Sequence, residues 1–204
     1  LLDLNLEVSY FTEGTFLATE LYKRSPYIIE WKASSADIFD RPIYISFDDI
    51  GHGTIITYSG DQEYETPMII GEWTDLYSGS VRCTITDYNA IVEQKENYKS
   101  NRYYFVINNP QNLVSKHIQN LQISLLNRSA QTIEIKYSGY NAEKTTDIVN
   151  SIAEKYLSYD VEVKKESAEN ILAFIEERLK VVYQNLDETE KQLHAFKKEN
   201  KINL

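Results

Sequence analysis

This sequence is poor in cysteine, glycine and proline, and it has no long hydrophobic run. Its single cysteine, Cys83, excludes a disulfide within the chain, and its place in the alternating segment 81–85 predicts a buried structural thiol. The seven glycines never form the phosphate-binding pattern G-x-x-x-x-G-K-[ST], so a nucleotide site of that kind is excluded. Gly51-His52-Gly53 instead predicts a hairpin turn. No apolar run reaches the roughly 20 residues that a membrane helix needs.

Negative charge is concentrated in the middle of the chain. The 204 residues carry a net charge of −10, and residues 29–114 hold 13 acidic and 6 basic side chains. This excess argues against nucleic acid and against a dedicated anionic-lipid surface, because both reward clustered Lys and Arg. The favoured interpretation is that this negative charge keeps the protein soluble. The alternative is that it prevents an anionic polysaccharide from adhering to the protein. The 42% of apolar residues are typical of a globular protein.

Groups that could perform catalysis or hold a metal are scattered. The three histidines, His52, His117 and His194, lack the spacing of metal ligands. Asp48 and Asp49 form the best carboxylate pair, but neighbouring side chains at a strand end point apart, which favours a solvated turn over glycoside hydrolysis. We therefore predict no catalytic, cofactor-binding or metal-binding residue, and no cofactor.

Residues 29–114 are expected to form a β-rich module. Short alternating runs separated by turn signals predict a small sandwich or barrel. The strand candidates are residues 28–31, 43–47, 54–58, 81–85 and 103–107. Four aromatic residues here could stack on sugars, although a place in the core is the commoner use of such side chains: Trp31, Trp73, Tyr77 and Tyr88.

The segments on either side of this module are expected to form an α/β domain. Near the start, Leu4, Leu6 and Val8 alternate and predict a strand that Gly14 ends, and residues 19–22 predict a helical turn. Further along the chain, two more segments alternate apolar and polar residues and predict half-buried strands, at 121–125 and 133–137. Asn141 then follows as the N-cap of a helix.

The last part of the chain carries a long heptad seam. Nine residues follow one another at alternating spacings of four and three, and only Thr189 among them is polar. We call them the seam: Ala168, Leu172, Ile175, Leu179, Val182, Leu186, Thr189, Leu193 and Phe196. A lone helix would expose this stripe to water, so we expect its partner in a further segment or in another subunit. The chain opens and stops inside elements, which predicts an excised piece of a longer protein.

An ordered series of segments resembles the chain-length determinant (Wzz-like) family of polysaccharide co-polymerases. More narrowly, the segments resemble the periplasmic part of the Wzc-type bacterial tyrosine kinases. The segments that carry it are 118–121, 133–139, 148–156, 174–179 and 193–197, with support from 20–27. Residues 30–115 match that family in character more than in residues.

The resemblance implies a function in the export of capsular or extracellular polysaccharide and in setting its chain length. It places this chain on the periplasmic face of the bacterial inner membrane, anchored through flanking helices. It also implies a ring of identical subunits, with a polysaccharide polymerase and an outer-membrane export protein as partners. The cytoplasmic ATP-binding domain and the tyrosine cluster of such kinases have no counterpart here, so we expect this chain to be non-catalytic.

Together these patterns predict an α+β fold, in which a membrane-proximal α/β domain holds an inserted β-rich, sandwich-like module and ends in a long coiled-coil helix. The expected boundaries are 1–28 and 115–162 for the α/β domain, 29–114 for the insertion and 163–204 for the long helix. Two alternatives stay open. One is a periplasmic adaptor of an efflux pump, which would need a second antiparallel helix and a lipoyl-like half-motif. The other is a module that binds or acts on polysaccharide.

Overall fold

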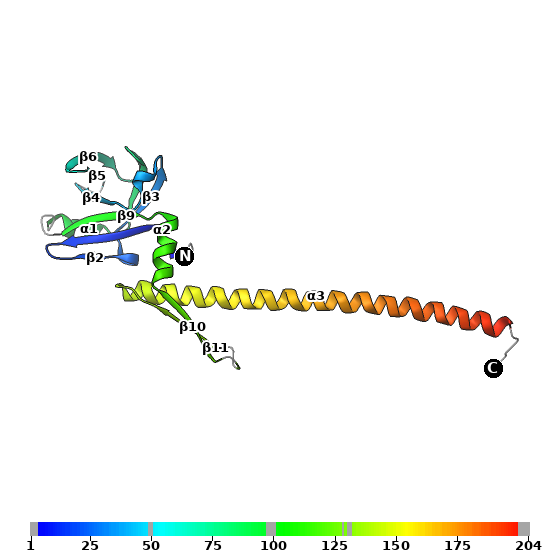
Figure 1. Ribbon diagram of the computed structural model, residues 1–204. Helices are drawn as coiled ribbons and strands as arrows, with labels where there is room; N and C mark the ends of the chain where they lie inside the picture. Colours follow the sequence, from blue (N-terminus) through cyan, green and yellow to red (C-terminus); the bar gives the residue numbers. More distant parts are fainter. Residues whose placement is uncertain (1–3, 49–50, 97–100, 128, 130–131, 200–204) are drawn as a thin grey trace. The chain divides into compact units, whose positions relative to one another are not determined.

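The computed structural model describes residues 4–48, 51–96, 101–127, 129 and 132–199, and it contains both helices and antiparallel sheets. The chain divides into two compact units, Leu1–Ser151 and Ile152–Leu204. The first unit holds every strand (Figure 1). The second is helical throughout its described part, because it lies within the helix α3, Ala142–Glu199. The prediction of a mixed fold with a long C-terminal helix is therefore confirmed.

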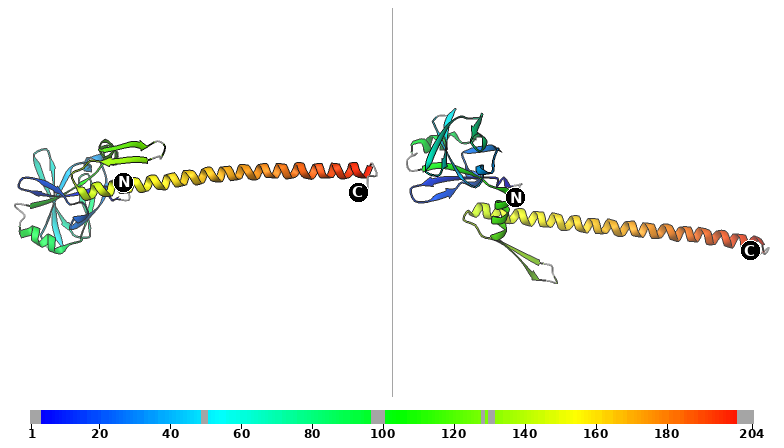
Figure 2. Two further views of the ribbon diagram at one scale, coloured as in Figure 1. Left: turned by 90° about the horizontal axis from the view of Figure 1, so that it is seen from below. Right: turned by 45° about the horizontal axis from the view of Figure 1, so that its top comes forward.

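The largest sheet of the first unit has six strands in the order β2-β1-β9-β4-β5-β6, all antiparallel. Their bounds are β1 Val8–Gly14, β2 Ala18–Glu20, β4 Pro42–Phe47, β5 His52–Ser59, β6 Gln62–Ile69 and β9 Asn101–Ile107. A second antiparallel sheet, in the order β3-β8-β7, consists of β3 Tyr27–Ala33, β7 Trp73–Leu76 and β8 Gly79–Ile85. The hairpin of β10 Leu121–Asn127 and β11 Thr132–Tyr137 pairs with neither sheet (Figure 2).

Short helices connect these strands. The 3₁₀ turns are η2 Tyr22–Arg24 and η3 Ala36–Ile38, and the α-helices are α1 Tyr88–Glu96 and α2 Pro110–Gln119. α2 begins with Pro110 behind Asn109, whose side chain accepts hydrogen bonds from two backbone amides of the first turn. A proline at the first position and an asparagine cap are the two features that favour a helix start.

The six-stranded and three-stranded sheets contribute to one hydrophobic core. Tyr27 from the small sheet is fully buried, and its ring lies 5.4 to 5.7 Å from the rings of Tyr10, Phe47 and Tyr103. Phe105 on β9 is equally buried. These aromatic contacts add to the burial of apolar area that holds the two sheets together. That this β-rich module is a sandwich stays a prediction.

The positions of several predicted strands are confirmed, and three predictions of local structure are wrong. All five strand candidates of the β module fall within strands. The strand expected from Leu4 instead begins at Val8, with a turn before it, and the helical turn expected at 19–22 begins as the edge strand β2. Gly53 was expected in a turn but lies inside β5, where a methyl group would collide with the carbonyl oxygen of Ser46.

The two helices expected after Asn141 are one. α3 runs without a break from residue 142 to 199, because this segment contains neither glycine nor proline. Ion pairs four residues apart support its middle, Asp160 with Lys164 at 2.7 Å and Lys165 with Glu169 at 3.8 Å. The four-part domain division stays a prediction. The first two strands, however, pair with the sheet of the predicted insertion.

The shared core predicts a position-dependent cost for the same substitution. Ile55 on β5 is fully buried, whereas Ile69 on β6 is 48% exposed. We expect Ile55→Ala to lower the free energy of unfolding by about 3 kcal/mol, because it leaves a cavity in the core. Ile69→Ala should cost less than about 1 kcal/mol. Urea unfolding followed by tryptophan fluorescence measures both, and equal losses would contradict this description of the core.

Candidate functional site

Polar side chains from the N-terminal strands hold the first turn of α3. The Oδ1 atom of Asn141 accepts a hydrogen bond from the backbone amide of Lys144 at 3.0 Å, which confirms the predicted N-cap. The side-chain amide of Asn141 donates to the carbonyl oxygen of Glu20 at 3.3 Å. Lys144 Nζ also lies 2.5 Å from Glu20 Oε1, and both side chains are mostly buried. Removing one partner of such a pair would leave the other charge desolvated and unpaired.

A second contact of this turn centres on Asp147. The hydroxyl of Tyr22 donates a hydrogen bond to Asp147 Oδ2 at 2.9 Å, and Lys23 Nζ lies 2.6 Å from the same oxygen. The hydrogen bonds from Lys23 and Tyr22 lower the pKa of Asp147, while burial and the Asp147 carboxylate raise the pKa of Tyr22 to about 12. Tyr22 has a φ of 44°, a left-handed conformation that is unfavourable for a tyrosine. Such backbone strain persists only where surrounding contacts impose it.

His117 on α2 is the one buried polar residue among those described, with 6% of its surface exposed. Its Nδ1 atom lies 2.7 Å from the hydroxyl of Tyr137 on β11, whereas Nε2 has no hydrogen-bond partner in the described part of the chain. Burial, followed by the charges of Lys144 and Lys116, lowers the pKa of His117 to about 4. The imidazole is therefore neutral at pH 7 and links α2 to the hairpin β10–β11.

The seam is exposed along its full length, from Ala168 to Phe196. Its leucine, isoleucine, valine and phenylalanine side chains are 51% to 60% exposed. Thr189, the one polar member, donates its hydroxyl to the carbonyl oxygen of Asn185 at 2.7 Å, so its polar group is satisfied within the helix. An amphipathic helix gains most of its stability by burying its apolar face. The seam is therefore a candidate surface for association, and the coiled coil itself stays a prediction.

The four aromatic residues proposed for sugar stacking have different surroundings. Trp31 packs edge-on against Phe39, with ring centroids 5.4 Å apart, next to the core. Trp73 is 37% exposed, and the ammonium group of Lys32 lies 4.1 Å from the centre of its ring. The other two are more exposed, with Tyr88 50% and Tyr77 99% open to solvent.

The remaining sequence candidates do not converge on a chemical site. Cys83 is buried as predicted, and burial raises the pKa of its thiol to about 12. Asp48 is exposed, and Asp49 lies outside the described residues. His52 and His194 are exposed on β5 and α3. Among the described residues, no three His, Cys, Asp or Glu side chains lie close enough to hold a metal ion.

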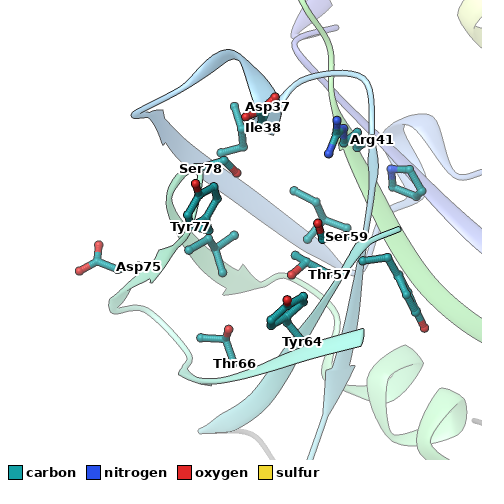
Figure 3. Close-up of a pocket in the computed structure, with 14 residues that line it drawn as sticks. Asp37, Ile38, Arg41, Thr57, Ser59, Tyr64, Thr66, Asp75, Tyr77 and Ser78 are labelled. Carbon is teal, nitrogen blue, oxygen red and sulfur yellow. The ribbon is translucent and has the colours of Figure 1, made fainter. Parts of the chain in front are cut away.

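A cavity of about 630 Å³ in the first unit was not suggested by any sequence pattern. It is bordered by η3, by β5 and β6, and by the turn between β7 and β8 (Figure 3). Of the aromatic residues singled out from the sequence, Tyr77 lines this cavity. The other lining residues come from segments that are brought together by strand pairing. The Glu20–Lys144 pair at the start of α3 was also missed, because these two residues are 124 positions apart in sequence.

In the described residues, no helix is both long and apolar enough to cross a membrane. α3 has the length, but charged side chains occur throughout it.

Comparison with known proteins gives partial matches, and no family model matches the chain. Over 94 residues it is 32% identical to the tyrosine-protein kinase wzc of Salmonella typhi, a stretch that covers 46% of this chain and 12% of that protein. The chain resembles a Wzc-type kinase. The corresponding protein of Salmonella typhimurium is 31% identical over the same length and the same shares. These matches confirm the predicted Wzc-type resemblance, whereas no family model supports the broader chain-length determinant family.

The matched stretch is about an eighth of the length of the Wzc relatives. Activities and partners of those whole proteins therefore come to this chain only as proposals.

The low pKa of His117 predicts a pH-dependent stability. Its pKa falls from 6.5 to about 4 on folding, so the unfolded chain binds more protons between these values. The free energy of unfolding should therefore fall as the pH is lowered from 6.5 toward 4, by roughly 1–3 kcal/mol from this residue. Urea unfolding at pH 7, 5.5 and 4.5 measures this loss.

His117→Gln is the matched control for that experiment. It keeps a polar side chain but removes the titration, so the fall between pH 7 and pH 4.5 should be smaller in the variant than in the wild type. Identical slopes in the two proteins would show that His117 titrates alike in the folded and unfolded states. The carboxylates with lowered pKa values act equally in both proteins and cancel in the comparison.

Proposed function

We propose that this chain is a periplasmic region of a Wzc-type polysaccharide co-polymerase of the bacterial inner membrane. Its parent would regulate the chain length and export of capsular or extracellular polysaccharide. The observation that carries this proposal is the 94-residue match to the wzc kinases. The exposed seam supports it, because a protein that works as an assembly needs association surfaces of this kind.

In this proposal the chain itself is non-catalytic. Tyrosine phosphorylation would belong to a separate part of the parent protein, since the sequence here contains no phosphate-binding loop. The contribution of the chain is structural. The first unit forms a folded β-rich body, and the seam packs against a returning helix or a neighbouring subunit in a ring.

The seam would then work as a coiled-coil interface. Its spacing of four and three residues keeps one stripe facing a partner helix. Each apolar side chain that becomes buried there would stabilise the assembly by roughly 1 kcal/mol, because about half of its surface is already covered in the lone helix. The polymerase and the outer-membrane export protein remain proposed partners by resemblance, and the membrane contact would come from flanking helices.

Charges placed in the seam test this proposal in the full-length parent. We expect Leu179→Asp combined with Leu186→Asp to alter the polymer length distribution or to abolish export, because a buried charge without a partner costs several kcal/mol. Gel analysis of polysaccharide from producing cells measures the outcome. Gln184→Asp introduces one such charge away from the seam and should leave polymer length unchanged from that of the wild type. Wild-type lengths in the double variant would show that the seam has no function.

The isolated chain should associate weakly. Each copy carries a net charge of −10, which opposes association most strongly at low salt, where screening is weak. We expect mostly monomer by analytical ultracentrifugation at micromolar concentration. Any dimer should increase with salt and disappear in the Leu179→Asp, Leu186→Asp variant. A stable closed ring of the wild-type chain would instead place the association energy in the first unit.

A further inference from the structure

The cavity of about 630 Å³ in the first unit has a lining rich in hydroxyl groups. Four serine and threonine side chains contribute to it, and two of these residues are half-buried on neighbouring strands, Thr57 on β5 and Thr66 on β6. Ser59 lies at the end of β5, and Ser78 lies in the turn between β7 and β8 (Figure 3). The volume falls within the range of about 300–1,000 Å³ that is typical of small-molecule sites.

These hydroxyl groups are available to a ligand. In the described part of the chain, none of the four side chains forms a hydrogen bond with another protein group. A hydroxyl can donate one hydrogen bond and accept two, so each can bind either a donor or an acceptor. A sugar presents many hydroxyl groups of the same dual character, and a hydroxyl-rich cavity can satisfy several of them at once.

Three tyrosines line the same cavity, Tyr58, Tyr64 and Tyr77, and the last two lie next to hydroxyl side chains. Tyr77, which is 99% exposed, lies beside Ser78 on one side, and Tyr64, which is 47% exposed, lies beside Thr66 (Figure 3). An aromatic ring combines a large apolar face with a polar hydroxyl tip. The C–H faces of a pyranose ring can pack on such a surface while its hydroxyl groups bond to the surrounding side chains.

The charges at the cavity argue against a phosphorylated or strongly anionic ligand. Arg41 is its one basic lining residue, and the lining also includes Asp37 and Asp75. The Asp75 carboxylate points away from the other labelled side chains and accepts a hydrogen bond from Ser80 at 2.7 Å (Figure 3). The surrounding module has 13 acidic and 6 basic residues, so a polyanion would be repelled.

We propose that this cavity binds a neutral pyranose unit of an oligosaccharide. Tyr77 and Tyr64 pack against the sugar ring, and the four hydroxyl side chains, with Arg41, form hydrogen bonds to its hydroxyl groups. The polysaccharide of the proposed function is the expected source of the sugar, and in that respect the inference rests on the proposed function. The chemistry of the site itself rests on the lining residues alone.

Titration of the 204-residue chain with neutral disaccharides tests the site. Maltose, cellobiose, lactose and mannobiose serve as probes, and backbone amide signals report where each one binds. We expect at least one of them to bind with a millimolar dissociation constant and to shift the signals of Thr57, Tyr64 and Tyr77. A disaccharide containing glucuronic acid should bind more weakly than its neutral counterpart, because it carries a negative charge.

Substitutions at two exposed tyrosines provide the matched comparison. Tyr77→Ala should weaken binding about tenfold, because the aromatic surface is lost. Tyr140→Ala removes an equally exposed ring that lies outside the cavity and should leave binding unchanged. Thr57→Val removes one hydroxyl at nearly constant volume and should also weaken binding. Because Tyr77 is almost fully exposed, its removal leaves the core intact.

Two outcomes would overturn this inference: no disaccharide in the panel shifts the cavity signals, or Tyr77→Ala and Tyr140→Ala weaken binding equally. Tighter binding of the glucuronic acid compound would overturn the assignment of a neutral sugar. The result is independent of the seam experiment. Sugar binding at the cavity together with unchanged polymer length in the seam variant would reject the proposed function of the seam and support the sugar site.

Discussion

The first unit depends on the apolar core that lies between its six-stranded and three-stranded sheets. Tyr27, Ile55 and Phe105 are fully buried there and come from three strands that are distant in sequence. Strand pairing alone would leave both sheets with an exposed apolar face, because side chains alternate between the two faces of a strand. Burial of these residues therefore determines which faces meet, and it also fixes the segments that surround the cavity.

The second unit has no comparable core. Its apolar side chains are more than half exposed along the seam, and its internal contacts are helical hydrogen bonds and ion pairs four residues apart. Exposed pairs of this kind contribute little to stability. The two units thus differ in how their described apolar residues are covered: those of the first pack against one another, whereas those of the seam are left open to a further helix or to another subunit.

The sequence predicted those features that depend on neighbouring residues, such as strands and helix caps. The alternating strands and the Asn141 cap were found because their signals lie within a few residues. The strand β6 was missed because it is an edge strand with one buried side chain and a proline, Pro67, which only an edge position tolerates. The helix α2 could have been predicted, since Asn109-Pro110 is a recognised helix start. The cavity and the Glu20–Lys144 pair could not, because tertiary pairing alone brings their residues together.

The distribution of tryptophan gives each unit its own spectroscopic signal. Trp31 and Trp73 are the two tryptophans of the sequence, and both belong to the three-stranded sheet and its packing. Their fluorescence therefore reports the first unit, while the far-ultraviolet circular dichroism of the chain is dominated by the 58 residues of α3. If the long helix melts independently, the two optical transitions will separate, and a single free energy of unfolding will not describe the molecule.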